Sequence, residues 1–296
     1  MRFSIRHETL YRYSGPVGLA PHILRLNPRT EGARVFAASL TIDPVPVARW
    51  DTTDRFGNRV THVRFEGVSD VLRVESSCEL DVAAAAPLRD PGLPRLPWPA
   101  DSNDGLADYR DEDGPEPAVK DFTEALARES GWAALSFLET LNRTLFTRFD
   151  RHIRIEGAAH SPAHTLTVGR GACRDLTVLF ISACRSLGIA ARFVSGYQAH
   201  AESQDGRRHL HAWPEVFLPG RGGAALMPPM APSSTMATWP CARPRSSPPP
   251  CRSKAAFSVT ESLPHSIITC RLRAGDDFPP PIRAPTPCKL LKQCKL

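Results

Sequence analysis

The stretch GRGACRDLTVLFISACRSLGIAARFVSGYQ, residues 169–198, carries the clearest structural pattern in the sequence. Two glycines form a tight loop, and the segment from Cys173 to Leu187 then has apolar residues on nearly every side of a helix. A helix that is apolar all round is buried, and Gly188 is a typical stop at its C-terminal end. The stretch therefore predicts a central buried helix followed by a strand over residues 191–198.

A second strand is predicted by RRHLHAWPEVFLPG, residues 207–220. Side chains alternate between the two faces of a strand. His209, His211, Trp213 and Glu215 therefore share one face of it.

Cys173 and His211 are the candidate catalytic residues. The first turn of a helix offers free N–H groups and a partial positive charge, which favour a thiolate and can hold an oxyanion. A histidine activates a thiol by taking its proton. Two simpler interpretations stay open, since a cysteine at a helix start can be a small buried hydrophobic residue and a lone histidine on a strand can be structural. CxxC spacing does not occur, and neither a metal nor a cofactor is expected.

Four regions follow from the pattern along the chain. Residues 1–85 alternate between apolar and polar, with turn signals between the runs, and predict a small antiparallel β-domain. Residues 86–117 are rich in Pro, Asp and Gly and indicate a linker or surface excursion. Residues 118–222 begin with two helices, at about 118–129 and 133–147, and contain the strands above.

Residues 223–296 form a tail whose composition differs from all that precedes it. It holds fourteen of the 29 prolines, five of the eight cysteines and four of the five lysines. Its net charge is +7, whereas the first 222 residues carry −1. Sparse periodicity with many prolines predicts a disordered tail.

These counts limit the partners and the location. The basic excess lies in the tail alone, so no nucleic-acid or membrane partner is expected for the folded part. The chain has no apolar run of about 18 residues, and charged residues occupy the N-terminal stretch where a signal peptide would be apolar. We therefore expect a cytoplasmic protein with cysteines as thiols. The sequence leaves the oligomeric state open.

GRGACRD, GIAARFVSGY and HAWPEV together resemble the transglutaminase-like core found in many bacterial proteins. SIRHETLYRYSGPVGLAPHILRLNPR and DRFGNRVTHVRF resemble the bacterial transglutaminase-like N-terminal β-domain. The resemblance covers about residues 1–222. It implies an α+β fold, with the β-domain followed by a papain-like core in which the central helix packs on an antiparallel sheet.

The resemblance also implies a Cys–His–Asp triad acting on a protein or peptide substrate. Cys173 is then the nucleophile and His211 the base, with Arg174, Asp175 and Trp213 as supporting residues. The implied reaction is acyl transfer from a Gln or peptide amide through a thioester, and it leaves transglutamination and hydrolysis both open.

The resemblance stops where the third catalytic residue should occur. The family continues with Gly-Trp-x-Gly-Phe-Asp-Pro-Thr, and its Asp falls near position 227, which is Met227 here. No Asp or Glu occurs between Glu215 and Glu261. Loss of one base near codon 223 explains this, because suitable codons for residues 223–231 read Arg-Gly-Phe-Asp-Ala-Pro-His-Gly in the shifted frame. We therefore predict an incomplete core and a weak or inactive enzyme.

Two other functions are compatible with the sequence. The first is a catalytically inactive peptide- or protein-binding module of the same fold, which would bind a substrate without turning it over. The second is an interaction protein that acts through its basic tail, which deletion of residues 223–296 would inactivate.

Overall fold

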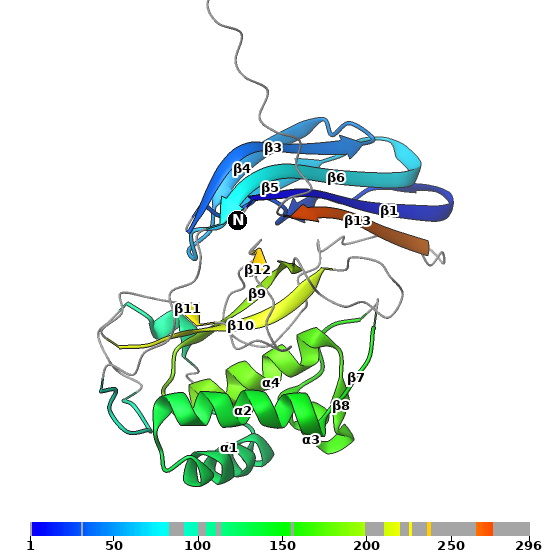
Figure 1. Ribbon diagram of the computed structural model, residues 1–296. Helices are drawn as coiled ribbons and strands as arrows, with labels where there is room; N and C mark the ends of the chain where they lie inside the picture. The colour runs from blue at the N-terminus through cyan, green and yellow to red at the C-terminus, as the bar shows by residue number, and fades with distance from the viewer. Residues whose placement is uncertain are drawn as a thin grey trace, which may run out of the picture.

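The computed structural model describes residues 2–30, 32–82, 92–99, 105–110, 114–154, 157–198 and 210–219, and the backbone of strands 225–226, 236–237 and 265–274. The fold is α+β, with N-terminal antiparallel sheets followed by a helical region and a further sheet. Figure 1 shows two central strands, β9 (Ala191–Gln198) and β10 (His211–Phe217), lying between the N-terminal sheets and the helices. The predicted fold class is confirmed.

The N-terminal domain is built from two antiparallel sheets. One has the order β13-β1-β6-β3, from His265–Ala274, Arg2–Gly18, Val68–Val82 and Ala33–Asp43. The other has the order β2-β5-β4, from His22–Leu24, Arg59–Arg64 and Ala48–Thr53. Alternating apolar residues such as Leu24, Val63, Leu72 and Val74 form one buried cluster, as the period-2 pattern requires.

The helical region packs around α4 (Cys173–Ser186), the predicted central helix. Helices α1 (Pro117–Glu129), α2 (Ala134–Arg148) and α3 (Pro162–Val168) all contact it. Leu176, Leu179 and Ala183 of α4 are fully buried and share a core with Ala191 of β9 and Val216 of β10. The two-residue strands β7 (Asp150–Arg151) and β8 (Arg170–Gly171) pair just before α4 begins.

The proline-rich excursion is attached to the far end of α4. Leu96 lies in the helical core, and the Trp98 N–H donates to the Leu187 carbonyl at 2.9 Å. A Cβ atom at Gly188 would lie 2.1 Å from the Trp98 carbonyl oxygen, so only glycine fits this crossing. The short helix η1 (Ala107–Tyr109) ends at Arg110, whose Nε donates to the Gly188 carbonyl.

Three strands of the tail are described. β11 (Ala225–Leu226) pairs with the end of β10, β12 (Met236–Ala237) pairs with the end of β9, and β13 pairs with β1 over ten residues. They depart from the expectation of a tail without structure. The β-branched run in HSIITCRLRA favours a strand. The remainder of 223–296 lies outside the described residues.

Candidate active site

Two glycines with different roles precede α4. Gly169 has φ +66° and ends α3 in the left-handed conformation, where its N–H donates to the Thr165 carbonyl. Gly171 is needed for space, since a Cβ atom there would lie 2.9 Å from Cβ of Asp175. The motif GRG therefore turns the chain tightly and lets the first turn of α4 approach it.

Asp175 fixes the start of α4 and is fully buried. Its Oδ2 accepts a hydrogen bond from the Ala172 N–H at 2.8 Å. Its Oδ1 accepts from the His160 N–H at 2.9 Å and from Nη2 of Arg154 at 2.6 Å. With both oxygens bonded and facing away from solvent, this carboxylate orients the helix start.

Cys173 is the first residue of α4 and is partly buried. Burial raises the pKa of its thiol, while the hydrogen bond from the Ala212 N–H and the charge of Arg174 lower this pKa to a smaller extent. The expectation that the helix N-terminus favours a thiolate at Cys173 stays a prediction, and burial acts against it. A base is needed to remove its proton at neutral pH.

His211 begins β10 and is half-buried. In the antiparallel register it stands opposite Gly196, and Ala212 stands opposite Ser195. Because the Ala212 N–H bonds the Cys173 thiol, the backbone places His211 one residue from that contact. The structure therefore brings the start of α4 and the start of β10 together at one point.

The other residues of the HAWPEV motif are buried. Trp213 is fully buried, and its indole N–H has no hydrogen-bond partner among the described residues. Glu215 accepts from Nε of Arg192 at 2.7 Å and lies 4.0 Å from Nη1 of Arg29 in the N-terminal domain. Arg192 also lies over the ring of Phe217. These groups pack the strand pair against the N-terminal domain.

The sequence did not single out three groups that support this site. Arg154 binds Asp175 through its guanidinium and accepts a hydrogen bond from Nη1 of Arg174 at its carbonyl. His160 contributes its backbone N–H to Asp175, and Ala212 contributes its own to Cys173. Two of the three act through backbone atoms, which leave no signal in residue type.

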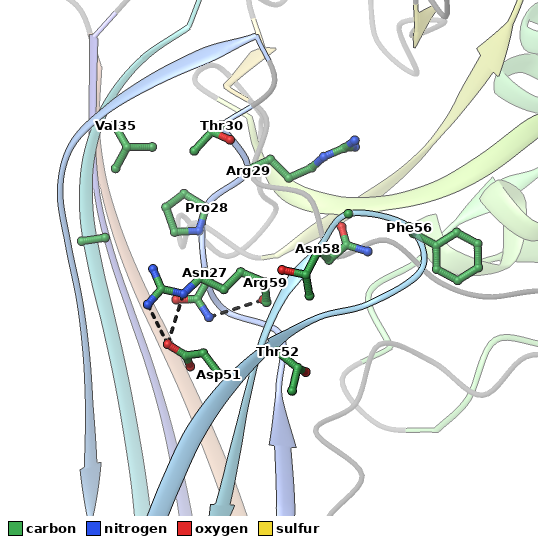
Figure 2. A pocket seen from close by; sticks show the side chains of 13 residues that line it. Asn27, Pro28, Arg29, Thr30, Val35, Asp51, Thr52, Phe56, Asn58 and Arg59 are labelled. Carbon is green, nitrogen blue, oxygen red and sulfur yellow. Dashed lines mark hydrogen bonds and ion pairs between the residues drawn. The ribbon is translucent and has the colours of Figure 1, made fainter.

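A pocket of about 650 Å³ lies in the N-terminal domain, away from Cys173 and His211. It is lined by residues from the segments 27–30, 35–38 and 51–59, and Figure 2 shows Asp51 bonded to Arg59 beside Asn27. The Asp51 carboxylate accepts from Nη2 of Arg59 at 2.6 Å and from the Thr61 hydroxyl at 2.5 Å. The charged side chains that line the pocket are thus partly paired with each other, and its described lining residues include no cysteine or histidine.

Some predicted positions lie outside the described residues, namely His209 and Met227. In the described parts of the chain, no group of three or more His, Cys, Asp or Glu side chains is placed to hold a metal ion. The helices described there include none with the length and apolar character to span a membrane.

Two families match this chain. Residues 3–81 match the bacterial transglutaminase-like N-terminal region, and residues 122–223 match the transglutaminase-like superfamily. The chain carries a transglutaminase-like core. Its transglutaminase-like core includes Cys173 and His211, and the match ends at residue 223, as predicted from the change in composition.

The chain has relatives in mycobacteria. Uncharacterised proteins of Mycobacterium bovis and Mycobacterium tuberculosis are 28 % identical over 237 residues, which cover 75 % of this chain and 75 % of each relative. A solved structure from Cytophaga hutchinsonii, described as a candidate cysteine protease, superposes with a TM-score of 0.61 at 16 % identity. The superposed region covers 94 % of this chain and 93 % of the Cytophaga hutchinsonii chain. This similarity shows that the two proteins share a fold.

Proposed function

We propose that the transglutaminase-like core is a Cys–His acyltransferase or protease acting on Gln or peptide amides, and that this chain has lost most of its activity. The observation that carries the proposal is the hydrogen bond from the Ala212 N–H to the Cys173 thiol, beside His211. With His211 as the neighbouring residue of β10, this contact supports a nucleophile, a base and a backbone donor close to one another. Such an arrangement is what nucleophilic acyl transfer requires.

The reaction follows from these groups. His211 takes the thiol proton as Cys173 attacks the amide carbonyl, and the Ala212 N–H stabilises the charged sulfur. The C–N bond then breaks, the leaving amine takes the proton from His211, and a thioester remains on Cys173. Water or a second amine, deprotonated by His211, attacks the thioester and releases the acyl group.

The missing third residue accounts for the proposed loss of activity. Asp175 has both oxygens bonded at the start of α4, and Glu215 pairs with Arg192, so both carboxylates are engaged elsewhere. No other acidic residue follows until Glu261. A hydrolytic triad that lacks its orienting carboxylate loses about 10⁴ in kcat.

We further propose that one base was lost near codon 223. The match to the superfamily ends at this position, where proline, cysteine and lysine content also change. Sequencing genomic DNA across codons 220–230 tests this: codons that read Arg-Gly-Phe-Asp when one base is restored support the proposal, and codons without that reading overturn it.

The activity test compares two proteins that differ by one base in the gene. The chain as it stands should release amine from peptide amides very slowly, and the frame-restored protein should be faster by about 10⁴. Cys173→Ala in each frame is the control and should abolish turnover. Equal rates of turnover in the two proteins would show that the missing orienting residue does not limit activity.

Cysteine labelling tests the nucleophile separately. Cys184 is the internal control, because it lies fully buried on the same helix and burial raises its pKa well above the usual range. Iodoacetamide should modify Cys173 faster than Cys184 at neutral pH. If it does not, and neither frame shows turnover, the inactive binding module is the better description.

A further inference from the structure

A buried hydrogen bond links the N-terminal β-domain to the end of β9. Tyr197 is the last residue but one of β9, and its hydroxyl lies 2.5 Å from Nδ1 of His7 on β1. The other ring nitrogen, Nε2, lies 2.9 Å from the Thr9 hydroxyl. His7 is 5 % exposed and Tyr197 is 2 % exposed. A neutral imidazole satisfies both contacts, and we assign Nδ1 as the acceptor of the Tyr197 hydroxyl proton.

An apolar cluster surrounds this hydrogen bond and draws on both domains. Tyr197 packs with Phe3, Ile5, Cys78 and Leu80 of the N-terminal sheet. Leu210, the residue directly before His211, packs against the same cluster. The end of β9 and the start of β10 are therefore held by one surface of the N-terminal domain.

The candidate catalytic residues lie next to these anchored positions. Gly196, which precedes Tyr197, stands opposite His211, and Ser195 stands opposite Ala212. The Ala212 N–H in turn bonds the Cys173 thiol. Displacing Tyr197 would therefore move the strand partner of His211 and loosen the backbone donor to Cys173.

We infer that His7 is a positioning residue for the Cys173–His211 site, acting from the N-terminal domain through Tyr197. A role in catalysis rests on the proposed function. The effect of His7 on the position of Cys173 and His211 can be measured even if the chain has no enzyme activity. On this view the N-terminal domain completes the active site of the core.

The test uses the full-length chain and measures the rate at which iodoacetamide modifies Cys173 across a range of pH. Tyr197→Phe removes the donor, and His7→Leu removes the acceptor. Each should slow modification at neutral pH by about fivefold, the change expected from loss of one hydrogen bond to the thiolate. The midpoint of the pH–rate curve should rise in both variants, because a less stabilised thiolate has a higher pKa.

Two controls separate positioning from simple loss of stability. His7→Asn keeps an acceptor oxygen near the place of Nδ1 and should restore the wild-type rate and midpoint. Val74→Ala truncates a buried side chain in the separate apolar cluster that contains Leu72. It should lower the free energy of unfolding without changing the rate or the pH midpoint of Cys173 modification.

The outcome is decisive with or without enzyme activity. If Tyr197→Phe and His7→Leu leave the Cys173 rate and midpoint unchanged, or if Val74→Ala alters them equally, the positioning role is wrong. If wild-type turnover does not depend on Cys173, the proposed function fails, while the labelling rates still decide the role of His7.

Discussion

The two faces of the β9–β10 strand pair are held in different ways. The face toward α4 is apolar and packs Ala191 and Val216 on Leu176 and Leu179. The contacts toward the N-terminal domain combine the apolar cluster around Tyr197 with polar contacts, such as the Arg192–Glu215 ion pair with Arg29 nearby. Apolar packing has no preferred direction, whereas hydrogen bonds and ion pairs do. Packing on α4 thus stabilises the fold, and the polar contacts on the other side also set the orientation of the domains.

Replacing Glu215 by Ala should have the largest effect, because it leaves Arg192 buried without its carboxylate. Both residues are less than 8 % exposed. Breaking a buried ion pair from one side costs about 3–5 kcal/mol. Urea unfolding at pH 7.5 measures this as a loss in the free energy of unfolding.

The double variant Arg192→Met/Glu215→Leu is the matched control. It removes both charges together, and it should recover most of the stability lost in Glu215→Ala. A double variant as unstable as the single one would show that this face depends on its charges for more than their mutual pairing.

Leu179→Ala tests the apolar face. Leu179 is fully buried on α4, and removing such a side chain costs about 3 kcal/mol through lost burial and the cavity left behind. We expect the rate of Cys173 modification to stay near the wild-type value below the unfolding transition. A large change in that rate would mean that the apolar face also sets the site geometry.

The hydrogen bond at His7 predicts a smaller, pH-dependent effect. Burial lowers the pKa of His7 from 6.5 to about 4, so between these values the unfolded chain binds the proton more readily. Stability from this group is therefore complete above about pH 6.5 and falls as the pH drops toward 4. Lowering the pH from 7.5 to 5 should cost about 2 kcal/mol.

The same urea experiment on His7→Asn isolates this contribution. His7 contacts Tyr197 and Thr9, and Ser76 stands opposite it on β6; none of these groups titrates between pH 5 and 7.5 by its usual pKa. The variant should lose about 2 kcal/mol less than the wild type over this range. An equal loss in the free energy of unfolding in both proteins would contradict the lowered pKa of His7.

Local periodicity was enough to predict the elements that position the site. The apolar segment from Cys173 and the alternating strand at His211 appear as α4 and β10, and the helices expected at about 118–129 and 133–147 appear as α1 and α2. The strand β4 was not predicted, because it is an edge strand with almost every residue exposed and lacks alternation. Helix α3, with seven residues, was too short for its periodicity to show.

The contacts that support the site could not be predicted from the sequence. Asp175 joins groups 15 and 21 positions away, and His7 meets Tyr197 across 190 positions. Such contacts depend on how the helices and strands pack in three dimensions. The spacing of residues along the sequence does not give this information. The raised pKa of Cys173 had the same origin, since burial at a helix start depends on what packs over it.

The wide separation of His7 and Tyr197 also sets an order of events during synthesis. Protein chains grow at about 5–20 residues per second, so β1 leaves the ribosome roughly 10–40 seconds before its partner on β9 is made. β1 can pair with β6 in that interval, but Phe3 and Ile5 have no Tyr197 to cover them. The newly made N-terminal domain therefore exposes an apolar surface until β9 is synthesised, and we expect chaperones to bind it during this period.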